Sequence, residues 1–138
     1  DCGDRALITD INSLPFPDYS DFATDIAEGR YNDPRRLEIF DSRGCGRTCH
    51  FCSEWQFWRV FRTMSGDRIF EEIRHQVLTY PKVDYFYFIG SLLNGSIKSL
   101  NRFCDLVIDS QMKISWAAAA DLEPDGVLDA AAITGLEL

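Results

Sequence analysis

Short β-forming runs alternate with segments of helical periodicity along this 138-residue chain, and the alternation restricts its fold more than any other feature. The clearest strand is 85–89, a run of aromatic and β-branched residues that ends at Gly90. We expect further strands at 37–41 and 112–116, and the start of a fourth at 136–138. Strands that alternate with helices predict an α/β fold with a parallel sheet and right-handed crossovers.

Three helices are predicted between these strands. The first begins at Gly66 and Asp67 and ends before Pro81. Its apolar residues share one face and its charged residues lie opposite: Ile69, Phe70, Ile73 and Val77 against Glu71, Glu72 and Arg74. The second helix places these residues at helical spacing: Ile97, Leu100, Cys104, Val107 and Ile108. The third starts near Pro124 and ends at Gly135.

The first 36 residues have no sustained periodicity and contain three prolines. This composition predicts a linker, with one short helix at 21–28 that Ser20 caps.

Three cysteines lie within eight residues, at Cys45, Cys49 and Cys52, in a C-x3-C-x2-C spacing. They offer three thiolates to one metal cluster, whereas iron–sulfur clusters are usually held by four cysteines. Such a loop therefore leaves one iron open to a substrate or cofactor. The loop follows the strand at 37–41 directly, which places it at the carboxyl end of a strand, where barrel enzymes carry their active sites.

Other interpretations of this loop stay open. Zinc takes four tetrahedral ligands, but only Cys49 and Cys52 have the usual C-x2-C spacing, and His50 would complete a site only with awkward geometry. A disulfide framework normally has an even number of cysteines, and this chain has five. A non-enzymatic electron carrier or a structural zinc protein is thus the alternative to an enzyme.

The segment 42–54, with the sequence SRGCGRTCHFCSE, resembles the cluster loop of radical S-adenosylmethionine (radical SAM) enzymes, which has an aromatic residue before the last cysteine. Residues 13–18, 91–95 and 103–106 resemble the cobalamin-binding branch of that superfamily. The resemblance covers most of the chain.

This resemblance implies a partial (β/α)6 barrel similar to a TIM barrel, with the first three βα units present and the fourth strand begun. Residues 1–36 would be the linker after a cobalamin-binding domain that lies outside this chain, and 37–138 the amino-terminal half of the barrel. We accordingly expect a fragment of a larger enzyme, and inactivity of the half-barrel by itself is a third alternative.

The resemblance also implies the cofactors. Cys45, Cys49 and Cys52 would bind a [4Fe-4S] cluster, and S-adenosylmethionine would bind its open iron and be cleaved reductively to start radical chemistry. Phe51 corresponds to the aromatic near the adenine. Gly90 and Ser91 stand where many relatives hold the methionine amino group with a glycine-glycine-glutamate stretch, which lacks its glutamate here. Cobalamin, bound outside the chain, would serve methyl transfer or rearrangement.

Partners follow from the same resemblance and from charge. A small molecule or peptide would be the substrate, and flavodoxin or ferredoxin the electron donor. The net charge of −8 disfavours nucleic acid and anionic membranes. The sequence has neither an apolar run of 18 residues nor a secretion signal, so a cytoplasmic location is expected.

Four arginines lie near the cysteine loop in the sequence: Arg43, Arg47, Arg59 and Arg62.

Overall fold

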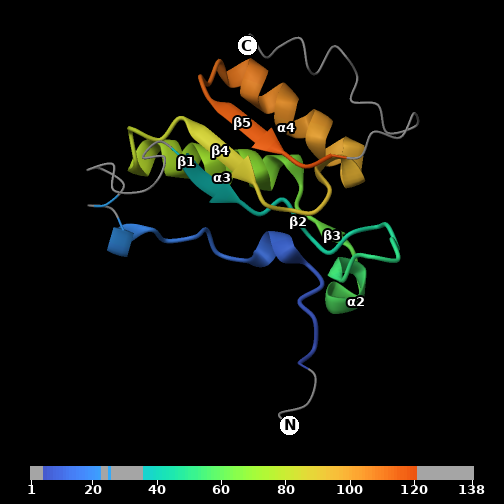
Figure 1. Cartoon of the computed structure of the whole chain (residues 1–138). Coiled ribbons are helices and arrows are strands. Elements are labelled where there is room, and N and C mark those ends of the chain that lie inside the picture. Colours follow the sequence, from blue (N-terminus) through green and yellow to red (C-terminus); the bar gives the residue numbers. More distant parts are fainter. Residues whose placement is uncertain (1–4, 23–24, 26–35, 121–138) are drawn as a thin grey trace.

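The computed structural model describes residues 5–22, 25 and 36–120. Their main feature is a three-stranded parallel sheet with the order β1–β4–β5 (Figure 1). Its strands are β1 (Arg36–Ile39), β4 (Tyr85–Phe88) and β5 (Ser115–Ala118). Leu37 lies opposite Phe86, which in turn lies opposite Trp116. The prediction of an α/β fold with a parallel sheet is therefore confirmed.

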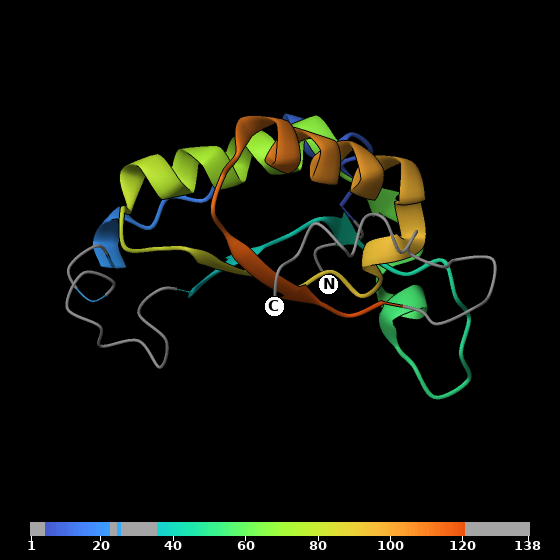
Figure 2. The ribbon, with the colours of Figure 1, turned by 90° about the horizontal axis from the view of Figure 1, so that it is seen from above.

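Two helices cover one face of this sheet. Helix α3 (Gly66–Thr79) lies between β1 and β4 in the chain, and α4 (Ile97–Ser110) lies between β4 and β5. Figure 2 shows the two helices side by side on the same side of the strands. Both helices match their predicted positions, while the predicted third helix and fourth strand lie outside the described residues.

Serine caps begin both helices. The Ser65 hydroxyl accepts a hydrogen bond from the Arg68 amide at 3.2 Å, and Ser96 does the same for Ser99 at 3.4 Å. Each cap satisfies one of the amide groups that a helix leaves unpaired in its first turn. Gln111 follows the last residue of α4 and stops the helix, because its φ of 53° places it in the left-handed region.

Central strand β4 supplies the middle of the hydrophobic core. Phe86 and Phe88 are buried with 0% and 1% exposure, because alternate side chains of a strand point to the helix-covered face. The Phe88 ring lies edge-on to Phe103 of α4 and Trp116 of β5, with centroid distances of 5.6 and 5.5 Å. These aromatic contacts join the sheet to α4.

The prediction that Glu72 lies on the outer face of α3 is wrong. Its side chain is only 2% exposed, and its carboxylate accepts a hydrogen bond from Arg68, one turn earlier, at 2.7 Å. Burial of Glu72 raises the pKa of its carboxyl group, against the opposing effect of Arg68. Arg68 also donates to the Leu14 carbonyl, so this ion pair joins α3 to the amino-terminal segment.

The amino-terminal segment, predicted as a linker, contacts α3. Its short 3-10 helix η1 (Ile11–Ser13) buries Ile11 in the core. Gln76 of α3 donates to the Pro17 carbonyl at 3.0 Å. Of the helix predicted at 21–28, the described part is the 3-10 turn η2 (Ser20–Phe22), and most of the remainder lies outside the described residues.

The third strand begins three residues later and ends two residues later than predicted, at Ser115–Ala118 instead of 112–116. Residues 112–114 connect α4 to β5, and the Ser115 amide then donates to the Asp84 carbonyl at 2.8 Å. Alanine has a low β propensity, so Ala117 and Ala118 gave no strand signal. Pairing with Tyr87 and Phe88 decides their conformation.

We expect Ile73→Val to lower the free energy of unfolding by about 0.5–1.5 kcal/mol, because it removes a buried methylene group. Ile73 is 0% exposed on α3, whereas Ile108 on α4 is 55% exposed. The same substitution at Ile108 is the matched control and should change stability by less than about 0.5 kcal/mol. Urea unfolding measures both, and equal losses would contradict the placement of the core.

Candidate metal centre

The cysteine loop projects from the carboxyl end of β1. Strands β2 (Ser42–Arg43) and β3 (Arg62–Thr63) pair antiparallel at its base, and helix α2 (Glu54–Trp58) lies within it (Figure 1). Sequence reasoning did not identify this small ribbon, because two residue pairs are too short to give a periodic signal. Its pairing makes the loop start and end at the same edge of the sheet.

Gly44 turns the chain from β2 into the loop. Its φ is 81°, in the left-handed region that glycine adopts without strain. A side chain here would also meet Trp58 and the Val60 carbonyl at 3.0 Å. The glycine before Cys45 is thus required by the backbone.

The three cysteines of the loop are free thiols, with Cys49 exposed and Cys45 and Cys52 half-buried. The Cys45 sulfur accepts a hydrogen bond from the Arg47 amide at 3.4 Å, and the Cys52 amide donates to the Cys49 carbonyl at 3.1 Å. Trp55 of α2 donates to the same carbonyl at 3.2 Å. Turns within the loop therefore fix its local conformation.

Within residues 5–22, 25 and 36–120, no three histidine, cysteine or acidic side chains gather closely enough to hold one metal ion. The structure thus brings the cysteines onto one loop without converging their sulfurs on a point. A cluster distributes its ligands over several irons, so it does not demand that convergence. Three free thiols on one loop fit an iron–sulfur cluster by the chemistry of their donors.

The other predicted site residues divide into two groups. Phe51 is 93% exposed at the tip of the loop. Gly90 and Ser91 follow β4 after Ile89, at the same edge of the sheet as the start of the loop.

Two carboxylates that sequence reasoning missed contact this glycine and serine. Asp41, 4% exposed, accepts a hydrogen bond from the Gly90 amide at 3.2 Å. Glu54, at the start of α2, accepts one from the Ser91 hydroxyl at 2.7 Å. Asp41 lies four residues before Cys45 and Glu54 two residues after Cys52, which is a sequence signal, but their partners lie 49 and 37 residues away.

Positive charge lies at the base of the loop. Arg43 and Arg62 are partners across the β2–β3 ribbon, and the Arg43 guanidinium stacks 3.5 Å from the centroid of Phe40. Burial, with a further contribution from Arg62, lowers the pKa of Arg43. Arg62 donates to the Ile8 carbonyl at 2.6 Å. The two like charges face each other, which opposes pairing of the ribbon.

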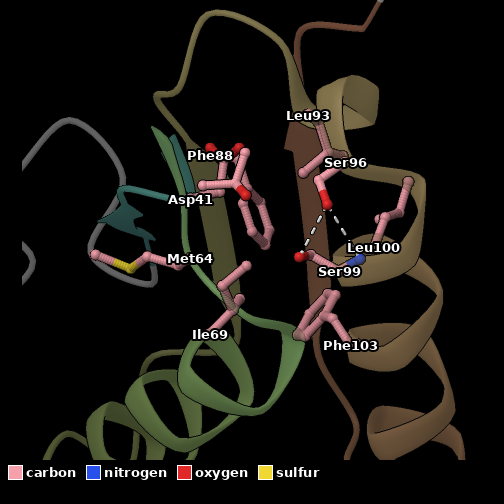
Figure 3. Close-up of a pocket in the computed structure, with 10 residues that line it drawn as sticks. Asp41, Met64, Ile69, Phe88, Leu93, Ser96, Ser99, Leu100 and Phe103 are labelled. Carbon is pink, nitrogen blue, oxygen red and sulfur yellow. Dashed lines mark hydrogen bonds between the residues drawn. The ribbon is translucent and has the colours of Figure 1, made fainter. Parts of the chain in front are cut away.

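A small cavity lies behind the loop, between the sheet and the two helices. Its volume is about 10 Å³, close to the least that admits one water molecule. Figure 3 shows Asp41 beside Phe88 on one side of the cavity and the hydrogen-bonded pair Ser96 and Ser99 on the other. This space is too small for a cofactor.

None of the helices in the described part of the chain has the length and apolar character needed to cross a membrane.

Two curated relatives are similar to this chain. Both carry the name anaerobic magnesium-protoporphyrin IX monomethyl ester cyclase, from Rubrivivax gelatinosus and from Cereibacter sphaeroides. Each is 31% identical, over 75 and 77 residues, which is 54% of this chain. The matched segments cover 13% and 12% of those proteins. No family model matches the chain, and no solved structure matches it.

We expect iodoacetamide to modify Cys49 faster than Cys104 at neutral pH. Cys49 is exposed, whereas burial on α4 raises the pKa of the Cys104 thiol and lowers its thiolate fraction. Mass spectrometry of peptides from timed samples measures both rates. Equal rates in the folded chain would contradict the burial of Cys104.

Asp41 should make stability depend on pH. Burial raises its pKa above the ordinary value of 3.8, so the folded chain holds the proton more tightly than the unfolded chain. Stability therefore falls as pH rises from 3.8 through the folded-state pKa. Asp41→Asn should remove the contribution of Asp41 to this fall, while Glu72, whose pKa burial also raises, keeps its own. Asp109→Asn, at an exposed position of α4, should leave the fall unchanged. Urea unfolding across this pH range measures the effect, and parallel curves for the two variants would contradict it.

Proposed function

We propose that this chain is part of a radical SAM enzyme, in which Cys45, Cys49 and Cys52 bind a [4Fe-4S] cluster and leave one iron open for S-adenosylmethionine. The observation that carries the proposal is the position of the loop. The loop that carries three free thiols with C-x3-C-x2-C spacing follows the carboxyl end of the first strand of a parallel sheet. Barrel enzymes place their reacting groups at that end of the strands.

Similarity to the two cyclases supports this assignment, although the chain spans about an eighth of their length. We propose that the sheet is the first half of a (β/α)6 barrel formed by 37–138, and that residues 1–36 link it to a cobalamin-binding domain. Substrate, electron donor and any cobalamin chemistry belong to the whole enzyme. A cytoplasmic location and a flavodoxin or ferredoxin as donor are part of the proposal.

The cluster, when bound, supplies the electron that cleaves the sulfonium carbon–sulfur bond of S-adenosylmethionine. The role of the protein is to bind, orient and shield. The three thiolates hold the irons, and the exposed Phe51 ring offers an apolar face to the adenine. The turn at Gly90 and Ser91 lies at the same edge of the sheet, where its polar groups would orient the methionine end.

Anaerobic reconstitution with iron and sulfide tests the proposal. We expect a [4Fe-4S] electron paramagnetic resonance signal in the reduced chain that changes when S-adenosylmethionine is added. Cys49→Ala should abolish the signal, whereas Cys104→Ala, the matched substitution on α4, should retain it.

Two outcomes would overturn the proposal. A cluster that does not respond to S-adenosylmethionine would indicate an electron carrier, since a carrier completes its four ligands from protein. Tight binding of zinc with no cluster would indicate a structural zinc site.

A further inference from the structure

Two residues that flank the three cysteines, Asp41 and Glu54, bind the neighbouring residues Gly90 and Ser91, which follow the central strand β4 after Ile89. The Gly90 amide donates to Asp41, four residues before Cys45. The Ser91 hydroxyl donates to Glu54, two residues after Cys52. We call these two hydrogen bonds the loop tethers.

The first tether extends the β1–β4 pairing beyond its last backbone bond. The Ile89 amide donates to the Ile39 carbonyl at 2.9 Å. The next amide, that of Gly90, donates to the Asp41 side chain. The Asp41 carbonyl also accepts from the Met64 amide at 2.7 Å, where the chain returns from the loop. Asp41, at the start of the loop, is thus hydrogen-bonded both to the segment just after the loop, at Met64, and to the segment just after β4, at Gly90.

Close packing keeps this contact in place. A Cβ atom added to Gly90 would lie 2.2 Å from an Asp41 carboxylate oxygen and 2.4 Å from the Ser42 hydroxyl. Glycine at position 90 therefore allows the backbone to approach the carboxylate closely enough to donate to it. This requirement explains Gly90 without a cofactor.

The second tether acts on the far side of the loop. The distance of 2.7 Å from Ser91 to Glu54 is typical of a charge-assisted hydrogen bond. Glu54 begins α2, and the Trp55 ring nitrogen donates to the Cys49 carbonyl. The position of Ser91 is thereby transmitted through α2 to the middle cysteine.

We propose that Asp41 and Glu54 are positioning residues, which act through Gly90 and Ser91 to hold the cysteine loop in the arrangement that receives iron. The inference rests on the proposed function for its purpose, while the tethers are properties of the chain without metal. A cluster needs its ligands held by their surroundings, and hydrogen bonds outside the ligands commonly supply that support.

Hydrogen exchange of the metal-free chain tests the tethers by themselves. In Ser91→Ala, the protected loop amides of Cys52 and Arg59 should exchange about fivefold faster, since one hydrogen bond no longer opposes opening. Ser91→Thr keeps a hydroxyl and should restore slow exchange. Ser110→Ala removes an exposed hydroxyl from α4 and serves as the control. Amides of α3 should not change in any of these variants.

Reconstitution tests the purpose of the tethers. Ser91→Ala and Glu54→Ala should bind less iron and give an altered electron paramagnetic resonance line shape, and Ser91→Thr should match the unaltered chain.

The outcomes separate the two proposals. Unchanged loop exchange in Ser91→Ala, or acceleration throughout α3 as well, would overturn the tethers. Faster loop exchange with unaltered iron content and line shape would overturn their role in positioning. Failure of the unaltered chain to bind a cluster would overturn the proposed function and leave the exchange result standing.

Discussion

Burial of the central strand beneath two helices is the constraint on which the remaining structure depends. Phe86 and Phe88 lie in one core cluster with residues of α3 and α4, and full burial of such rings is among the largest favourable contributions available to a small domain. Backbone groups in this dry interior must then pair, so β4 takes β1 on one side and β5 on the other. The carboxyl ends of β1 and β4 consequently meet at one edge.

At that edge the structure uses polar side chains where the backbone ladder ends. Asp41 is almost completely buried, and a buried carboxylate is costly unless it is hydrogen-bonded. The Gly90 amide supplies such a bond, and Ser91 beside it reaches Glu54. The cysteine loop therefore contacts the sheet through Gly90 and Ser91, whose positions follow from the packing of β4 in the core. Cys49 and Phe51 of this loop are exposed.

Prediction from sequence succeeded where a pattern extends over many residues. Helices α3 and α4 each contain 14 residues with apolar side chains at regular spacing, and both were located correctly. It failed at Glu72, because a charged residue is expected in water. The amino-terminal segment that Arg68 binds through the Leu14 carbonyl is 54 residues away in the sequence. It also placed the third strand too early, because alanine has a low β propensity. Ala117 and Ala118 are extended because they pair with Tyr87 and Phe88 of β4.

For the candidate site, the sequence by itself determined the three cysteines, their spacing and their place after the first strand, since these are properties of neighbouring residues. The tertiary structure alone decided that Asp41 meets Gly90 and that Glu54 meets Ser91. Those contacts join residues 49 and 37 positions apart. They exist because parallel pairing of β1 with β4 brings the carboxyl ends of the two strands together. A local sequence pattern cannot show which distant residues this pairing makes neighbours.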